Sequence, residues 1–290
     1  MMPELNRRRF MTGTSAALLS AMLLPKGAAA AGAEERSGNR RPLRILILNP
    51  NSSPEFTEVI TSEARRSASP GTEFVGVTAE FGPRYVGTHA SVAVAGHAAL
   101  DGLSRVLATD TAFDAAILAG FGALGAPALR ELAPFPVVDM LEASLSAALL
   151  FGRRSSILTG GVRWVPMLQE RVQALGLSER VASVRAIPLT GAEIVADRER
   201  ALSLLAELSE ACVRDDGAEC VVLGGAAVAG MPRLMADRVS VPLIDNVAVA
   251  VATAEMLARV VVMPAGARQG LPAIDSVGLS AELATAIRQG

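Results

Sequence analysis

Short aliphatic runs recur along the chain from residue 43 to residue 245, each bounded by glycine or polar residues. The first, LRILILN, is almost continuously apolar, which is typical of a parallel strand buried on both faces. We predict strands within 43–49, 73–79, 114–122, 136–139, 155–159, 181–187, 218–226 and 242–245. Longer stretches with helical apolar spacing follow most of these runs. They predict helices from near Pro54, over 90–108, after Asp139, and over 163–175, 198–214 and 247–262. The alternation predicts the α/β class.

The pattern occurs twice in the chain. Gly120 corresponds to Gly225 at a separation of 105 residues, and Asp139 corresponds to Asp245 at a separation of 106. Asn49, at the end of the first run, lines up with Thr159 at a separation of 110. A unit of this length that occurs twice indicates two similar halves.

We therefore predict two pseudo-symmetric, Rossmann-like domains, each with a parallel sheet, and a ligand cleft between them. Domain 1 is expected to comprise 43–139 together with 246–290, and domain 2 to comprise 140–245. In open parallel sheets a ligand binds just outside the carboxyl ends of the strands. The predicted site therefore consists of residues at these ends in both halves: Asn51, Ser52, Gly120, Phe121, Thr159, Gly160, Gly225 and Ala226.

Each part of this site also has a simpler interpretation. The turn Asn49-Pro50-Asn51-Ser52-Ser53 supplies amides and hydroxyls that suit an anion or a carboxylate, but it also suits a plain cap for the helix that begins near Pro54. Gly120 and Gly225 are equally compatible with strand-to-helix turns that bind nothing.

Four titratable side chains are candidates for acid/base chemistry. His89 ends a Gly- and Pro-containing loop, 81–89, that also holds the single tyrosine of the chain. The others are Asp139, Glu142 and Asp245, and the two aspartates also stand where they would cap the following helices.

Composition excludes several function classes. A net charge of −2 and 3% aromatic residues give no footprint for nucleic acid. Two cysteines and two histidines form no metal-ligand spacing, so we expect no metal. Cys212 and Cys220 form either a disulfide or two buried thiols. Neither a phosphate-binding P-loop nor a G-x-S-x-G motif is present.

The first thirty residues have the order of a signal peptide. Arg7-Arg8-Arg9 precedes a mildly apolar stretch, 16–24, which is too short to span a bilayer, and the small residues Ala28-Ala29-Ala30 follow. The arginine pair resembles a twin-arginine export signal. We predict a signal peptide over 1–30, a flexible lead-in over 31–42, and a periplasmic protein whose partners are the twin-arginine export machinery and a small-molecule ligand. The mature chain is expected to lack a membrane span, and the organisation is compatible with a homo-oligomer.

An ordered set of motifs resembles the aspartate/glutamate/hydantoin racemase superfamily, most closely its hydantoin and allantoin racemases. The set spans the chain from residue 43 to about residue 260 and comprises Asn49-Pro50-Asn51-Ser52-Ser53, Gly82-Pro83, Ala119-Gly120-Phe121-Gly122, Arg130-Glu131, Pro136-Val137-Val138, Glu142-Ala143-Ser144 and Leu223-Gly224-Gly225-Ala226. The resemblance implies two α/β domains around a cleft. It also implies cofactor-independent proton transfer by two cysteines, one in each half, on opposite faces of one carbon.

The family's two cysteine positions match Gly120 and Gly225 in this chain, so the resemblance implies a racemase scaffold without the two thiols. The expected function is proton transfer at the carbon next to a carbonyl, in a small amino-acid-derived carboxylate or cyclic amide, with His89 as a candidate replacement acid/base. The alternative is a periplasmic protein that binds such a molecule without turnover.

Overall fold

The computed structural model describes residues 41–122, 124–263 and 272–289. The chain from Pro42 onward forms one compact unit. The predicted signal peptide, 1–30, and nearly all of the lead-in, 31–42, lie outside the described residues. Within the part of the chain that is described, no helix has both the length and the apolar character needed to cross a membrane.

The first half of this unit contains a four-stranded parallel sheet. Its strands are β1 (Arg44–Asn49), β2 (Glu73–Thr78), β3 (Ala115–Leu118) and β4 (Val137–Asp139), in the order β2-β1-β3-β4. Strand β1 is central and its Ile45, Leu46 and Ile47 are fully buried. This explains why its sequence is continuously apolar rather than alternating.

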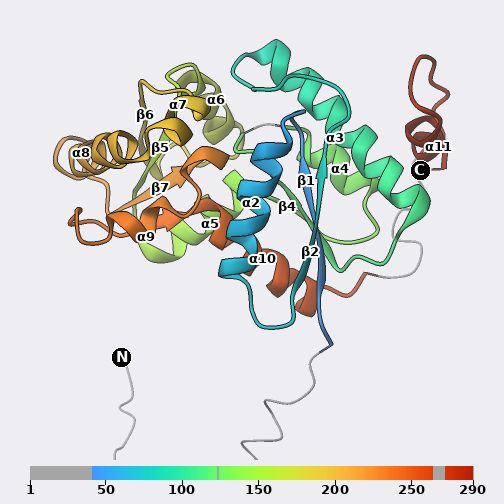
Figure 1. The fold of residues 1–290 in the computed structure, drawn as a ribbon, viewed down its shortest axis with the longest axis horizontal. Coiled ribbons are helices and arrows are strands. Elements are labelled where there is room, and N and C mark those ends of the chain that lie inside the picture. Colours follow the sequence, from blue (N-terminus) through green and yellow to red (C-terminus); the bar gives the residue numbers. More distant parts are fainter. Residues whose placement is uncertain (1–40, 123, 264–271, 290) are drawn as a thin grey trace, which may run out of the picture. The chain divides into compact units, whose positions relative to one another are not determined.

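The second half repeats this topology. Strands β5 (Ser155–Gly160), β6 (Val181–Ile187), β7 (Cys220–Gly224) and β8 (Leu243–Asp245) form a parallel sheet in the order β6-β5-β7-β8. Figure 1 shows this sheet apart from the one that contains β1. The two orders are equivalent, so the predicted class of two pseudo-symmetric parallel-sheet halves is confirmed.

The helix after the fourth strand of each sheet reaches into the other half. Helix α5 (Met140–Phe151) packs against β7 and β8, α10 (Asn246–Val260) packs against β3 and β4, and the two helices pack on each other. Asp139 caps α5 by accepting a hydrogen bond from the N–H of Glu142 at 2.9 Å. Asp245 caps α10 by accepting from the N–H of Val247 at 2.9 Å. Both aspartates are therefore the helix caps that the sequence indicated.

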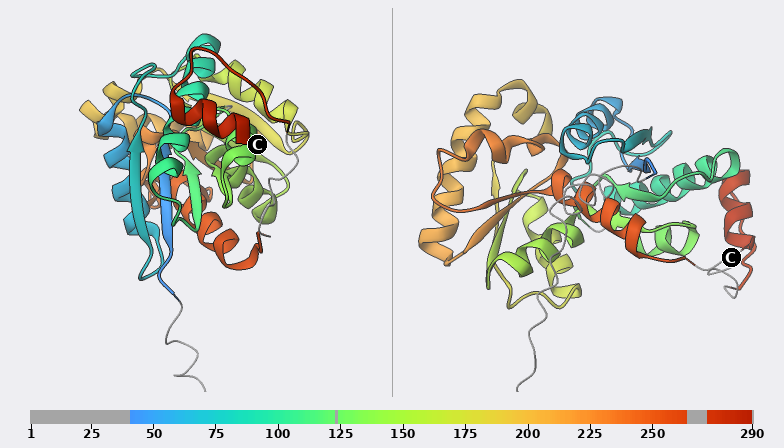
Figure 2. Two further views of the ribbon diagram at one scale, coloured as in Figure 1. Left: turned by 90° about the vertical axis from the view of Figure 1, so that its right-hand side faces the viewer. Right: turned by 90° about the horizontal axis from the view of Figure 1, so that it is seen from below.

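The remaining helices cover the sheets. Those in the first half are α2 (Pro54–Ser67), α3 (His89–Thr109) and α4 (Ala126–Leu132), and those in the second half are α6 (Trp164–Ala174), α7 (Gly191–Ala196), α8 (Arg198–Asp216), the 3₁₀ turn η1 (Ala226–Val228) and α9 (Met231–Met235). Near the C-terminus α11 (Ala281–Gln289) packs on α3, as Figure 2 shows.

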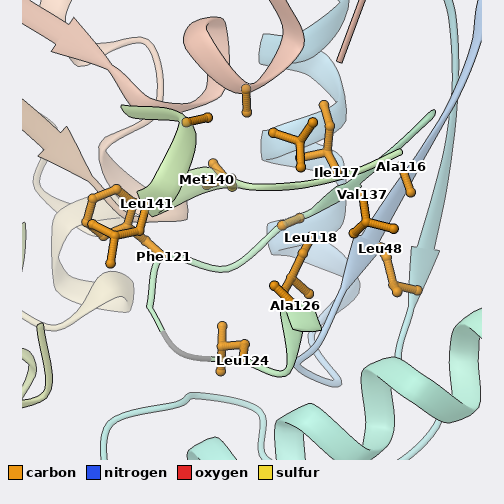
Figure 3. Packing of buried hydrophobic residues seen from close by; sticks show 14 of the residues in the cluster. Leu48, Ala116, Ile117, Leu118, Phe121, Leu124, Ala126, Val137, Met140 and Leu141 are labelled. Carbon is orange, nitrogen blue, oxygen red and sulfur yellow. The ribbon is translucent and has the colours of Figure 1, made fainter. Parts of the chain in front are cut away.

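The main hydrophobic core crosses from one half to the other. It includes Leu48 and Ile117 of the first sheet together with Ile157 and Val222 of the second. Figure 3 shows the part of this core around β3 and β4, including Phe121 and Leu124 on the segment that leaves β3. Because they share this core, the halves are packed on each other as well as linked by the chain. Cys212 and Cys220 are buried and free, so of the two cysteine alternatives the buried thiols hold.

Candidate functional site

A cavity of about 90 Å³ lies where β1, β3, β5 and β7 end. Both halves contribute to its wall, as expected for a ligand site at the carboxyl ends of two facing parallel sheets. Most of the wall is apolar or glycine, and the polar side chains among the described lining residues are those of Asn51, Tyr85, Thr159 and Trp164. The wall is completed by Pro50, Phe56, Val86, Ala119, Gly120, Phe121, Leu124, Gly160, Gly191, Ile194, Gly224, Gly225, Ala226, Ala227 and Val228.

The structure brings seven of the eight predicted strand-end residues to this wall: Asn51, Gly120, Phe121, Thr159, Gly160, Gly225 and Ala226. Ser52 is the exception. Its hydroxyl donates to the carbonyl of Gly82 at 3.1 Å and its N–H donates to the carbonyl of Pro83 at 3.0 Å. Ser52 therefore anchors the loop before α3 instead of facing the cavity.

None of the four acid/base candidates lines the cavity. His89 is the first residue of α3, and its side chain is 69% exposed with Nε2 3.7 Å from a carboxylate oxygen of Glu170. Its placement on the surface speaks against the role as a replacement acid/base. Glu142 accepts hydrogen bonds from Arg130 and Arg171, and the two aspartates cap their helices.

Burial strongly affects one of these carboxyl groups. Asp139 is only 1% exposed, and one of its carboxylate oxygens has no hydrogen-bond partner among the described residues. Burial, with a smaller contribution from the charge of Glu142, raises the pKa of Asp139 to about 6, against the lowering effects of the Glu142 N–H, Arg171 and Arg130. The raised pKa belongs to a buried carboxyl group that caps α5 and does not line the cavity.

Asn51 and Thr159 present complementary hydrogen-bonding atoms to the cavity. The Oδ1 of Asn51 accepts from the N–H of Ser53 at 3.0 Å and from Nδ2 of Asn49 at 3.2 Å, which orients the amide and leaves its Nδ2 as the donor for a ligand. The hydroxyl of Thr159 donates to the carbonyl of Gly224 at 2.8 Å, so its lone pairs are available to accept a hydrogen bond. The first half therefore offers a hydrogen-bond donor to the cavity, and the second half offers an acceptor.

The two glycines of the repeat have different surroundings. At Gly120 an added Cβ would overlap Cδ1 of Leu124 and lie 3.1 Å from Cγ of Pro50. At Gly225 the nearest atom to an added Cβ is the Thr159 hydroxyl at 3.6 Å, but the backbone has φ +117°, which L residues rarely adopt. A side chain is thus opposed by packing at one position and by backbone conformation at the other.

Three aromatic residues at the site were not predicted from the sequence. Phe56 belongs to α2, Tyr85 to the loop before α3, and Trp164 begins α6. Desolvation raises the pKa of Tyr85 above its ordinary value, against a hydrogen bond with Trp164 that lowers it, so the phenol keeps its proton at neutral pH. The sequence signal for Tyr85 was its place in a Gly- and Pro-containing loop beside a strand end, whereas helical residues such as Phe56 carry no such signal.

Comparison with known proteins agrees with this geometry. Residues 45–254 match the sequence profile of a family described as Asp/Glu/Hydantoin racemase. Hydantoin racemase of Paenarthrobacter aurescens is 32% identical over 215 residues, which are 74% of this chain and 91% of that protein. The allantoin racemase structure from Pseudomonas fluorescens has a TM-score of 0.71 at 40% identity and covers 75% of this chain and 91% of its own. The allantoin racemase structure from Klebsiella pneumoniae has a TM-score of 0.70 at 30% identity, with 74% and 87% covered.

Proposed function

This chain belongs to the Asp/Glu/hydantoin racemase family, and from that premise we propose that it binds a small cyclic amide of the hydantoin type in the cavity between its halves. We further propose that it moves the proton on the carbon next to a ring carbonyl. The named similarity to hydantoin and allantoin racemases supports both the ligand class and the reaction.

The observation that carries the proposal is the pair formed by Asn51 and Thr159. A cyclic amide has carbonyl groups that accept hydrogen bonds and ring N–H groups that donate them. Nδ2 of Asn51 can donate to a ring carbonyl, and the hydroxyl of Thr159 can accept from a ring N–H. No lysine, arginine or histidine is among the described lining residues, so a neutral ring fits this wall better than a free carboxylate does.

The reaction would proceed without the two thiols of the family. Removing a proton from a carbon next to a carbonyl places negative charge on the carbonyl oxygen, which a fixed donor such as Asn51 Nδ2 stabilises. Leu124 occupies the space beside Gly120, whereas the space beside Gly225 lies open next to the Thr159 hydroxyl. A hydroxide ion from solvent would therefore take the carbon-bound proton from the Gly225 side and become water, and a water molecule would return a proton to the same carbon and regenerate hydroxide.

A second function, binding without turnover, is favoured by one specific observation. Tyr85 is the single titratable side chain among the described lining residues, and its raised pKa makes it a hydrogen-bond donor rather than a base at neutral pH. The two functions share one ligand site and differ in whether the carbon-bound proton is lost.

A binding experiment followed by an exchange experiment tests the proposal. Hydantoin should raise the melting temperature of the protein in a concentration-dependent manner, since a ligand that binds only the folded state stabilises it. Thr159→Val removes the acceptor and nearly keeps the shape, so it should weaken hydantoin binding by about 2- to 12-fold, the worth of one neutral hydrogen bond. Ser203→Ala, an exposed hydroxyl change in α8, is the control. Equal affinities of Thr159→Val and wild type would place the ligand elsewhere.

We also propose that the protein is exported to the periplasm by the twin-arginine route, on the basis of Arg7-Arg8 ahead of a short, mildly apolar stretch. Changing both arginines to lysine should leave uncleaved precursor in the cytoplasm. Normal delivery of the lysine variant to the periplasm would show that this proposal is wrong.

A further inference from the structure

The single tyrosine and the single tryptophan of the chain meet at the cavity, one from each half. Tyr85 lies in the loop before α3, and Trp164 is the first residue of α6. The two side chains form a hydrogen bond in which the indole N–H donates to the phenol oxygen, because an indole has no acceptor. The phenol of the first half therefore reaches across to the second half.

Two glycines make room for this phenol. A Cβ added at Gly161, which follows β5, would lie only 2.7 Å from the Tyr85 hydroxyl, and a Cβ added at Gly87 would lie 2.8 Å from Cε1 of the ring. Gly161 also has φ +83°, a conformation that L residues rarely adopt. The hydroxyl end of Tyr85 thus lies directly on the backbone of the second half, and any side chain at residue 161 would displace it.

The backbone on both sides of Tyr85 is held to the first half. The hydroxyl of Ser53 donates to the carbonyl of Arg84 at 2.8 Å, and Val86 is 7% exposed and belongs to the main core. Tyr85 itself is 44% exposed. Because the backbone is anchored and the ring is not enclosed, the part of this loop that can move is the Tyr85 side chain, by rotation about χ1.

Tyr85 also stands between the cavity and a larger hollow. This second hollow has a volume of about 600 Å³, and Phe56 and Tyr85 line both spaces. Of the two spaces, Trp164 lines only the cavity, and it is 9% exposed. The phenol is therefore the outer of the two hydrogen-bonded rings, and it covers the side of the cavity on which the indole lies.

We propose that the Tyr85 side chain is a gate that opens and closes the cavity. In the closed position, which is the one described above, its hydroxyl lies on Gly161 and Trp164 and its ring covers a molecule bound in the cavity. In the open position the ring turns away into the second hollow, and a ligand can pass. The gate rests on the proposed function for the identity of that ligand, a cyclic amide of the hydantoin type.

Trp164 reports on the gate without any label, because it is the only tryptophan of the chain. Quenching of its fluorescence by acrylamide measures how readily a small neutral molecule reaches the cavity. Tyr85→Ala should raise the quenching rate constant at least about twofold, since it removes the cover from a nearly buried indole. Phe81→Ala is the matched control. It removes another aromatic ring of the same loop, 37% exposed and packed on His97, and should leave quenching unchanged.

The exchange of hydantoin distinguishes a gate from a simple contact. NMR line shapes in a titration give the association and dissociation rate constants of the ligand. Loss of a side chain that only contacts the ligand changes mainly the dissociation rate constant. Loss of a gate should raise the association rate constant as well, at least about threefold in Tyr85→Ala. Tyr85→Phe keeps the ring and loses only the hydroxyl, so it should raise the association rate constant less than Tyr85→Ala does.

The outcomes separate the gate from the proposed function. Circular dichroism and melting temperature establish that the variants are folded. An unchanged quenching rate constant or an unchanged association rate constant in Tyr85→Ala would overturn the gate, while hydantoin binding by the wild type still supported the cavity site. Failure of the wild type to bind hydantoin would overturn the proposed function, and acrylamide quenching would then decide by itself whether Tyr85 closes the cavity.

Discussion

The Cδ1 methyl of Leu124 occupies the space that a side chain at residue 120 would need. Leu124 is 2% exposed and belongs to the main core, so its position is held by packing. The backbone of Gly120 is not in the left-handed region. Packing against Leu124 and Pro50 alone therefore opposes a side chain at residue 120.

The contact between residue 120 and Leu124 predicts that substitutions at these two positions are coupled in their effect on stability. Gly120→Cys should lower the free energy of unfolding by about 1–3 kcal/mol through overpacking, and Leu124→Ala should lower it by about 2–4 kcal/mol through a cavity. The double variant should lose less unfolding free energy than the two single losses added together, by at least about 1 kcal/mol. The reason is that the thiol fills the space of the lost methyl groups. Denaturant unfolding of the three variants measures this coupling. Gly96→Ala, where an added Cβ finds its nearest neighbour at an ordinary 3.6 Å, is the control for a glycine change. Strict additivity would contradict the packing account.

Much of the fold could be predicted because it depends on local pattern. The strand predicted over 181–187 has the same bounds in the structure, and helices predicted over 90–108 and 163–175 differ by one residue at each end. The helix predicted over 247–262 ends earlier, at Val260, where the exposed Val261 and Val262 continue the apolar sequence without helical backbone. Helices α7 and α11 were not predicted, because short segments of six and nine residues give little periodic signal.

The candidate site could be predicted only as far as the repeat describes it. Strand ends were placed correctly because equivalent positions of two parallel sheets meet at one edge. Ser52 and His89 were residues of suitable chemistry, but a side chain's direction depends on its partners, here Gly82 and Glu170. Leu124 and Phe56 reach the cavity from outside the repeat register, so tertiary packing alone reveals them.

The raised pKa of Asp139 predicts a pH dependence of stability. The folded pKa, about 6, exceeds the ordinary value of 3.8, so the folded state binds this proton more tightly than the unfolded state does. The contribution of Asp139 is therefore fully present below about pH 4 and is lost as the pH rises through about 6. Relative to Asp139→Asn, which keeps a capping oxygen, wild type should lose on the order of 1–3 kcal/mol of stability between pH 4 and pH 7.

Asp110→Asn provides a control of opposite sign. The N–H of Ala112 and then the guanidinium of Arg44 lower the pKa of Asp110, so its contribution is present above the ordinary pKa and is lost as the pH falls. Urea unfolding of wild type against Asp139→Asn from pH 4 to pH 7, and of wild type against Asp110→Asn from about pH 5 down to about pH 2, measures the two slopes of stability with pH. If the stability contributions of Asp139 and Asp110 changed with pH in the same direction, the raised pKa of Asp139 would be contradicted.

The ion pair between Glu63 and Arg233 links α2 of the first half to α9 of the second. Arg233 donates to both carboxylate oxygens, at 2.6 and 3.0 Å, and Glu63 is only 3% exposed. Arg233→Ala should cost about 2–4 kcal/mol of unfolding free energy, because the buried carboxylate keeps only the Ser67 hydroxyl at 3.2 Å and the more distant Arg66 at 3.8 Å. Arg238→Ala removes an exposed pair with Glu199 at 2.7 Å and should cost less than about 1 kcal/mol. Equal costs in the two variants would show that the buried pair does not join the halves in the way described.

Thiols are excluded from the proposed chemistry by their position. Cys212 and Cys220 are fully buried and absent from the cavity wall, and burial raises the pKa of both. Neither can present a thiolate to a ligand between the halves at neutral pH.

Proton exchange into deuterated water tests the central claim most directly. The measurement follows, by proton NMR, the loss of the signal from the C5 proton of 5-benzylhydantoin, with wild-type protein, with the Cys212→Ala/Cys220→Ala variant and with no protein. General catalysis of proton transfer contributes about 10²–10⁴-fold, so even partial catalysis is readily visible against the protein-free rate. The account predicts exchange above that rate, equal in the wild-type and cysteine-free proteins. Exchange that disappears with the cysteines would contradict the claim of a thiol-independent site, and bound ligand with no exchange in either protein would contradict the claim of proton transfer.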